Sequence, residues 1–146
     1  MRVIFLDIDG VMAPIPYRKE PEEFSLIAVR SLNYLVDKTD AKIVISSLWR
    51  TLYKWDVLLE ILAKNGIKSV PIGRTQEFAN FMERENEIQA WLDDNPDVTN
   101  YVILDDMEGL FDKLESNLVP INEFNGLSPQ DVEDACEILM ADTIAV

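Results

Sequence analysis

The fold is decided by the stretch VIFLDIDG at residues 3–10. Its first four residues are all apolar, which predicts a short strand buried on both faces, because a half-solvated strand would alternate apolar and polar residues. The apolar run stops at Asp7, and a second carboxylate, Asp9, follows two residues later. Gly10 permits the tight backbone path that a turn needs at this point. The stretch therefore predicts a buried strand that presents two carboxylates at its carboxyl end.

Two more apolar runs end in polar pairs. They are KIVISS at residues 42–47 and YVILDD at residues 101–106. Residues 70–72 predict a weaker strand. Residues 118–121 predict a final strand at the edge of the sheet, because Pro120 cannot donate a hydrogen bond to a neighbouring strand.

Helical patterns separate these runs. Residues 24–36, 55–62 and 88–92 carry apolar residues at helical spacing. A last helix is expected to begin at Ser128, its N-cap, with Pro129 in the first helical position. Strands and helices thus alternate about five times, which predicts an α/β fold with a mainly parallel five-stranded sheet and helices on both faces. The length of 146 residues predicts a single domain over residues 1–146.

Composition argues against several classes of protein. The net charge is −14, so an extended nucleic-acid-binding face is not expected, although a nucleic-acid end stays among the candidate substrates. The chain has no histidine, which excludes Ser-His-Asp and Cys-His catalysis and His-ligated zinc. The single cysteine, Cys136, excludes an internal disulfide and fits a cytoplasmic location. No apolar run approaches about 18 residues, so no membrane span is expected.

The polar ends of the three strands should meet at one edge of the sheet. Parallel sheets place ligands beyond the carboxyl ends of their strands, at the point where strand order reverses. Carboxylates gathered there repel one another unless a cation joins them, and oxygen ligands without His or Cys select Mg²⁺. We therefore expect a Mg²⁺ site that also takes a phosphorylated substrate. The expected metal ligands are Asp7, Asp9, Asp105 and Asp106, and the pattern leaves open which of the last two binds the metal directly.

Roles in phosphoryl transfer follow from this arrangement. Asp7 is the candidate nucleophile, which would form an aspartyl-phosphate, and Asp9 is the candidate general acid and base. Ser46 can donate a hydrogen bond to a phosphoryl oxygen, and Arg84 is our choice for the cation that neutralises the transferring group. Further substrate contacts are expected from Gly10, Ser47, Arg50 and Arg74, and the two arginines are second candidates for that cation.

These residues resemble the motifs of a known family. FLDIDGV at residues 5–11 resembles the first motif of the haloacid dehalogenase (HAD) superfamily. IVIS at 43–46 is similar to the second motif and VILDD at 102–106 to the fourth. Arg84 stands where the family has its basic third motif. Other segments, among them SSLWR at 46–50, resemble a small group of HAD domains associated with RNA repair proteins.

The resemblance implies a three-layer Rossmann-like domain, Mg²⁺, an aspartyl-phosphate intermediate and phosphatase activity. Cap domains of this family are inserted after the first motif or between the second and third. Only about 15 residues separate Gly10 from the first expected helix, and only a helix and a strand separate Ser46 from Arg84. A capless member with an open site is therefore expected, with a flap at residues 12–17.

Two other readings remain open. A non-catalytic phospho-acceptor or binding module on a HAD-like or receiver-like fold would also gather carboxylates around Mg²⁺. Receiver domains, however, need a lysine at the end of the last strand, and none follows residues 118–121. A degenerate HAD domain retained for interaction need not keep both Asp7 and Asp9. Neither the substrate nor the oligomeric state is predicted by the sequence.

Overall fold

The computed structural model describes residues 1–15, 20, 22–78 and 83–142, and its centre is a parallel β-sheet. The strands are β1 (Arg2–Leu6), β2 (Lys42–Ile45), β3 (Gly73–Arg74), β4 (Asn100–Asp105) and β5 (Leu118–Pro120). They lie in the order β3-β2-β1-β4-β5, and every neighbouring pair is parallel. The expected five-stranded sheet, with the Pro120 strand at its edge, is confirmed.

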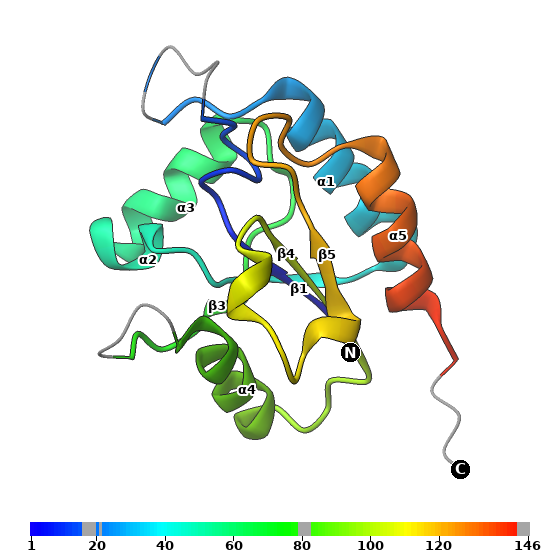
Figure 1. The fold of residues 1–146 in the computed structure, drawn as a ribbon. Coiled ribbons are helices and arrows are strands. Elements are labelled where there is room, and N and C mark those ends of the chain that lie inside the picture. Colours follow the sequence, from blue (N-terminus) through cyan, green and yellow to red (C-terminus); the bar gives the residue numbers. More distant parts are fainter. Residues whose placement is uncertain (16–19, 21, 79–82, 143–146) are drawn as a thin grey trace.

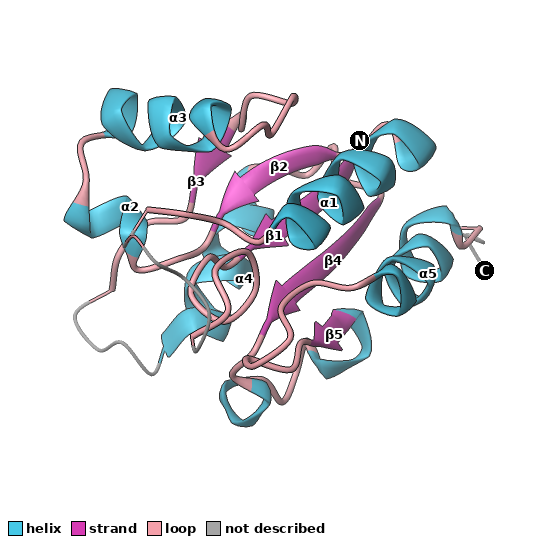
Figure 2. Cartoon of the chain, turned by 90° about the horizontal axis from the view of Figure 1, so that it is seen from above, coloured by secondary structure: helices cyan, strands magenta, loops and turns pink. Residues whose placement is uncertain are grey.

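Helices cover both faces of this sheet (Figure 1, Figure 2). They are α1 (Leu26–Thr39), α2 (Trp49–Leu52), α3 (Trp55–Lys64), α4 (Arg84–Asp94) and α5 (Pro129–Met140), with 3₁₀ turns η2 (Glu108–Leu110) and η3 (Glu115–Asn117). Residues of α1, α3 and α5 pack on one face, and residues of α4 pack on the other. The result is the expected three-layer arrangement. Among the described helices, none has the length and apolar character needed to cross a membrane.

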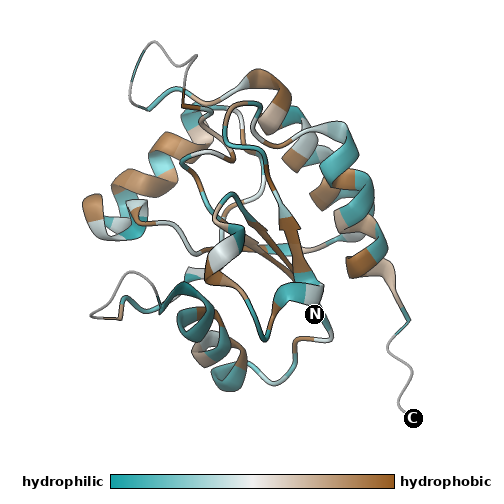
Figure 3. Cartoon of the chain, viewed as in Figure 1, coloured by the Kyte–Doolittle hydropathy of each residue, from teal (hydrophilic) through white to brown (hydrophobic). Residues whose placement is uncertain are grey.

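The strand side chains divide between two cores because successive residues point to opposite faces. On β1, Ile4 and Leu6 face the larger core under α1, α3 and α5, whereas Val3 and Phe5 face a smaller core under α4. Phe5 makes an edge-to-face contact with Trp91 of α4, with ring centroids 5.6 Å apart. Figure 3 shows apolar strands at the centre and a mainly hydrophilic α4. A fully apolar strand such as β1 thus reflects burial on both faces.

Polar side chains fix the helix ends. Ser128 and Asp131 form a reciprocal capping box at the start of α5, with Pro129 next to the cap as expected. At the amino end of β1, the Arg2 guanidinium donates to the carbonyl of Leu139 at 3.0 Å and to that of Thr39 at 3.1 Å. These carbonyls belong to the last turns of α5 and α1, so Arg2 joins both helices to the sheet.

The prediction of a strand at residues 70–72 is wrong. Pro71 has no backbone N–H, and Val70 and Ile72 are 69% and 49% exposed. The N–H of Ile72 donates to the carbonyl of Ile43, and the paired strand residues are Gly73 and Arg74 of β3, which run beside the last two residues of β2. The apolar residues Val70 and Ile72 therefore lie on the surface, in the segment that leads into the edge strand.

The described connections that could carry a cap are short. After β1, the N–H groups of Val11, Met12 and Ala13 all donate to the carbonyl of Ile8, which forms a compact turn. After β2, the chain forms only α2, α3 and β3 before the gap that precedes α4. Within the described residues, neither connection holds a further domain. Part of the expected flap, residues 16 and 17, lies outside the described residues.

Candidate active site

The strand register brings three polar strand ends together. Leu6 of β1 lies beside Ile45 of β2 and Leu104 of β4. The backbone continues this pairing beyond the strand, since Asp7 donates to the carbonyl of Leu104 and Ser46 to that of Leu6. The chain runs outward from β1 to β2 and β3 on one side and to β4 and β5 on the other, so this is the point where strand order reverses.

Three carboxylates form a cluster at this edge. Oxygen atoms of Asp7, Asp105 and Asp106 all lie within 4.8 Å of one another. Asp7 is 4% exposed and Asp105 is fully buried, while Asp106 is half-buried. Gly10 packs against this cluster with a φ of +79°, and a Cβ at that position would lie 2.7 Å from Cγ of Asp106. Gly10 is thus required both by its backbone conformation and by the position of Asp106.

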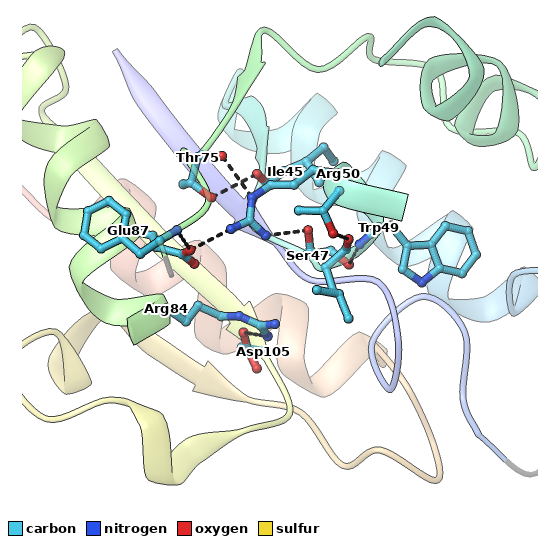
Figure 4. Close-up of polar contacts among 11 residues, drawn as sticks. Ile45, Ser47, Trp49, Arg50, Thr75, Arg84, Glu87 and Asp105 are labelled. Carbon is cyan, nitrogen blue, oxygen red and sulfur yellow. Dashed lines mark hydrogen bonds and ion pairs between the residues drawn. The ribbon is translucent and has the colours of Figure 1, made fainter. Parts of the chain in front are cut away.

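Arg84 supplies the positive charge of the cluster. It is the first residue of α4, and its Nη1 lies 2.8 Å from Oδ2 of Asp105 and 3.3 Å from Oδ2 of Asp7. Burial alone lowers the pKa of Arg84, but the carboxylates of Asp7 and Asp105 outweigh this and raise the pKa above its ordinary value. Figure 4 shows Arg84 reaching from α4 toward Asp105. The expected basic residue therefore contacts the candidate nucleophile.

One arginine does not balance three acidic groups. Burial, and then the Asp105 carboxylate, raise the pKa of Asp7 well above its ordinary value, although Arg84 acts in the opposite direction. Burial also raises the pKa of Asp106. A cluster of carboxylate oxygens with unbalanced negative charge and no sulfur or imidazole ligand is suited to a hard divalent cation. The residues present thus fit a hard divalent cation such as Mg²⁺, and Asp7, Asp105 and Asp106 are the carboxylates that could hold it.

The two serines after β2 differ in their surroundings. Ser46 is fully buried, and among the described residues its Oγ has no hydrogen-bond partner. Ser47 Oγ accepts a hydrogen bond from the N–H of Trp49 at 3.1 Å and so supports the start of α2. Ser46 therefore has a buried hydroxyl at the strand end without a partner among the described residues, while Ser47, which we expected to contact substrate, has a structural partner.

Asp9 lies in the turn that follows β1. It is half-buried and forms an isolated bridge with Ala13. Its carboxylate does not belong to the group formed by Asp7, Asp105 and Asp106. Of the four expected metal ligands, the structure therefore gathers the side chains of three.

Arg50 and Arg74 lie differently from what we expected. Arg50 is 7% exposed, and its guanidinium is directed to protein groups, as Figure 4 shows. It forms a 2.8 Å ion pair with Glu87 of α4. Arg74 is exposed and stacks over the ring of Trp55, with its guanidinium carbon 5.1 Å from the ring centroid. Of the three candidate arginines, Arg84 is the one with ion pairs to Asp7 and Asp105.

Glu87 was missed by the sequence analysis. It is 4% exposed and makes an ion pair with Arg50. A signal for it was present, since Glu87 lies four residues before Trp91 and next to Ile88, which places a carboxylate on the apolar face of the helix. A charged residue on such a face is expected to have a buried partner.

Comparison with known proteins agrees with this geometry. The family model for the HAD domain in Swiss Army Knife RNA repair proteins matches residues 3–132. No match was found among curated proteins or among solved structures. The match covers most of the chain and includes β1, β2 and β4 with the polar residues that follow them. The chain therefore belongs to the family of HAD domains in Swiss Army Knife RNA repair proteins.

Proposed function

We propose that the chain is a Mg²⁺-dependent phosphomonoester hydrolase in which Asp7 is transiently phosphorylated. The observation that carries this proposal is the cluster of Asp7, Asp105 and Asp106 with Arg84 at the carboxyl edge of the sheet. The HAD family to which the chain belongs supports a hydrolase of this general type. The cluster combines a buried nucleophile, a cation for the transferring group and the ligands for a hard metal ion.

The three carboxylates would divide the work of metal binding. Both oxygens of Asp105 already have protein partners, because Oδ1 accepts from the N–H of Met107 and Oδ2 from Arg84, each at 2.8 Å. Asp106 is half-buried and so has the more accessible carboxylate. We assign direct ligation chiefly to Asp7 and Asp106, with Asp105 holding Arg84 in place. When bound, Mg²⁺ would supply positive charge that neutralises phosphoryl oxygens during transfer.

The protonation state of Asp7 explains why a cation is needed. Burial and the Asp105 carboxylate raise the pKa of Asp7, so both disfavour its carboxylate form. Only the carboxylate form can attack phosphorus. A positive charge beside Asp7 favours that form, and Arg84 contributes part of this charge through its 3.3 Å contact.

The reaction would proceed in two steps. In the first, an oxygen of Asp7 forms a bond to phosphorus, the bond to the leaving oxygen breaks, and Asp9 gives that oxygen its proton. In the second, Asp9 takes a proton from water as the water oxygen attacks phosphorus, which releases inorganic phosphate and regenerates Asp7. Ser46 would donate its available hydroxyl to a phosphoryl oxygen, and Arg84 would neutralise the charge that develops in both steps.

The substrate class is to be found by a phosphate-release screen. Nucleotides, sugar phosphates, phosphorylated oligonucleotide ends and a generic aryl phosphate would each be tested with MgCl₂ and with EDTA. The net charge of −14 disfavours long nucleic acids more than short phosphorylated ends. We expect Mg²⁺-dependent release that is lost in Asp7→Asn and falls by roughly 10²- to 10⁴-fold in Asp9→Asn.

Asp134→Asn is the matched control for this screen. Asp134 is exposed on α5, outside the carboxylate cluster, so this variant should retain full activity. Unchanged phosphate release in Asp7→Asn would refute the mechanism. Phosphate binding without turnover of any substrate would favour the non-catalytic phospho-acceptor or binding module instead.

A further inference from the structure

A buried ion pair lies behind the candidate active site. Nη2 of Arg50 is 2.8 Å from Oε2 of Glu87, and the two side chains are 5% and 4% exposed. Burying two charges costs desolvation energy that their attraction often fails to exceed, so such a pair is weak evidence for a stabilising role. The other contacts of Arg50 and Glu87 indicate a positioning role instead.

Arg50 joins three separate segments of the chain. Its Nη1 donates to the carbonyl of Ser47 at 2.7 Å, and its Nε donates to the carbonyl of Thr75 at 2.9 Å. The third contact is the ion pair with Glu87. Figure 4 shows these bonds diverging from one guanidinium. A planar guanidinium can hold three such partners in fixed directions, whereas a lysine ammonium cannot reproduce this fork.

Glu87 fixes the beginning of α4. Its Oε2 also accepts the N–H of Phe78 at 2.7 Å, which ties the helix to the segment after β3. The N-cap residue of α4, Glu83, makes no side-chain capping hydrogen bond. Tertiary contacts help to hold the first turn of α4, since Glu87 lies one turn after Arg84 and Glu85 accepts from the N–H groups of Asp112 and Leu114.

We propose that Arg50 and Glu87 are positioning residues that hold Arg84 against Asp7 and fix the Ser46 loop beside it. The proposal rests on the proposed phosphatase function. Through Ser47, Arg50 holds the loop that carries Ser46, and through Glu87 it holds the helix that begins with Arg84. Asp7 follows directly on β1 and does not depend on this ion pair for its position. The pair instead positions Ser46 and Arg84 relative to Asp7.

Arg50→Lys tests this inference, and Arg2→Lys is its matched control. Arg2 likewise uses Nε and Nη1 to bind two backbone carbonyls, but at the opposite end of β1. Both variants keep the positive charge and lose the fork. We expect Arg50→Lys to lower kcat by about ten- to a hundredfold, because a misplaced group about 1 Å from its productive position has effects of this size. KM should stay within about threefold, and Arg2→Lys should keep kcat unchanged.

A second readout does not depend on turnover. The Arg84 Nε–H is buried without a partner among the described residues, so its side-chain ¹H–¹⁵N signal reports directly on the position of this group. The signal is assigned by its loss in Arg84→Lys. We expect Arg50→Lys to shift or broaden it and Arg2→Lys to leave it in place.

A double variant separates positioning from stability. Arg50→Met with Glu87→Gln removes both charges, which avoids leaving one buried and unpaired, and the glutamine can still accept from Phe78. We expect this variant to remain folded, as judged by circular dichroism, yet to keep the low kcat and the altered Arg84 signal of Arg50→Lys. If it fails to fold, Arg50→Lys alone decides.

The outcomes separate this inference from the proposed function. If the native protein hydrolyses no phosphomonoester, the proposed function fails, and the Arg84 signal still tests the positioning role. If kcat and the Arg84 signal of folded Arg50→Lys both equal those of the native protein, the inference is overturned. The same holds if Arg2→Lys changes them as strongly as Arg50→Lys does.

Discussion

Replacing Asp106 with asparagine should stabilise the metal-free protein and abolish its stabilisation by Mg²⁺. The carboxylate oxygens of Asp7, Asp105 and Asp106 lie within 4.8 Å of one another, and Arg84 makes ion pairs with the first two. Asparagine is nearly the same size as aspartate and removes one negative charge from the cluster. The protein would therefore gain stability by losing part of its candidate site.

The structure sets the size of this effect. Two unit charges 4.8 Å apart would repel by about 3.5 kcal/mol at an effective dielectric constant of about 20, and the raised pKa values of Asp7 and Asp106 relieve part of this repulsion because each group can take up a proton. Asp106 is half-buried, so solvent screens part of the repulsion, and we expect a net gain of about 1–2 kcal/mol in the free energy of unfolding. For a chain of this length the gain corresponds to a rise of roughly 3–8 °C in Tm.

Thermal unfolding in EDTA and in increasing MgCl₂ measures both parts of the prediction. At a free Mg²⁺ concentration of 100 times Kd, the native protein should gain about 2.7 kcal/mol, whereas Asp106→Asn should gain little. Asp134→Asn, an exposed substitution on α5, should change stability by less than about 0.5 kcal/mol and keep the full response to Mg²⁺.

Two results would refute this reasoning. One is a lower Tm for Asp106→Asn than for the native protein in EDTA, since it would mean that the carboxylates do not repel. The other is an equal Mg²⁺ response in both proteins, which would place the ion elsewhere. Calcium or sodium at matched ionic strength shows whether any response is specific.

Two further predictions concern Gly10 and Glu85. Gly10→Ala should lose about 1–2 kcal/mol of stability because of its positive φ and should also weaken the Mg²⁺ response by displacing Asp106. Gly66→Ala has a similar φ, and its Cβ would make only an ordinary contact 3.6 Å from Cγ1 of Val29, so in thermal unfolding it should show the first loss alone. Glu85→Gln tests acid stability: burial raises the pKa of Glu85, but the N–H groups of Leu114 and its neighbours outweigh this and lower the pKa. Because its pKa is lowered in the folded state, the Glu85 carboxylate stabilises the fold at pH values above the ordinary pKa of glutamate. This stabilisation is lost as the pH falls through the pKa of the folded state. Urea unfolding should thus show a smaller loss of stability on acidification for Glu85→Gln than for the native protein, and equal losses would contradict this.

The sequence predicted those parts of the fold that local patterns determine. Residues 42–45 form β2 as expected, and α5 begins at Pro129 after its Ser128 cap, because apolar runs and capping residues act over a few positions. The prediction of a strand at 70–72 was wrong because Pro71 has no backbone N–H and the apolar side chains beside it are exposed. The position of β3 is determined by its pairing with β2. Edge strands depend on their neighbour more than on their own composition.

The candidate site was predicted to a similar extent. The meeting of Asp7, Ser46 and Asp105 follows from the parallel register of three strands, which the apolar runs already indicated. The partners of Arg50 could not be predicted, because Glu87 is 37 positions away and no local pattern couples the two. Long-range side-chain contacts of this kind require the packing of α4 onto the sheet.

The two hydrophobic cores differ in size, and this difference affects which part of the protein unfolds first. The carboxylates of the cluster lie at the carboxyl ends of β1 and β4, whose side chains enter both cores, whereas Arg84 lies on a helix that packs on the smaller core alone. Detaching α4 exposes less apolar surface than detaching the opposite layer, so it requires less free energy. Amide hydrogens of α4 should accordingly exchange with solvent faster than those of β1. When α4 detaches in this way, Arg84 would move away with it while the carboxylates stay on the sheet. The candidate site would then keep its negative charges without the arginine that faces them.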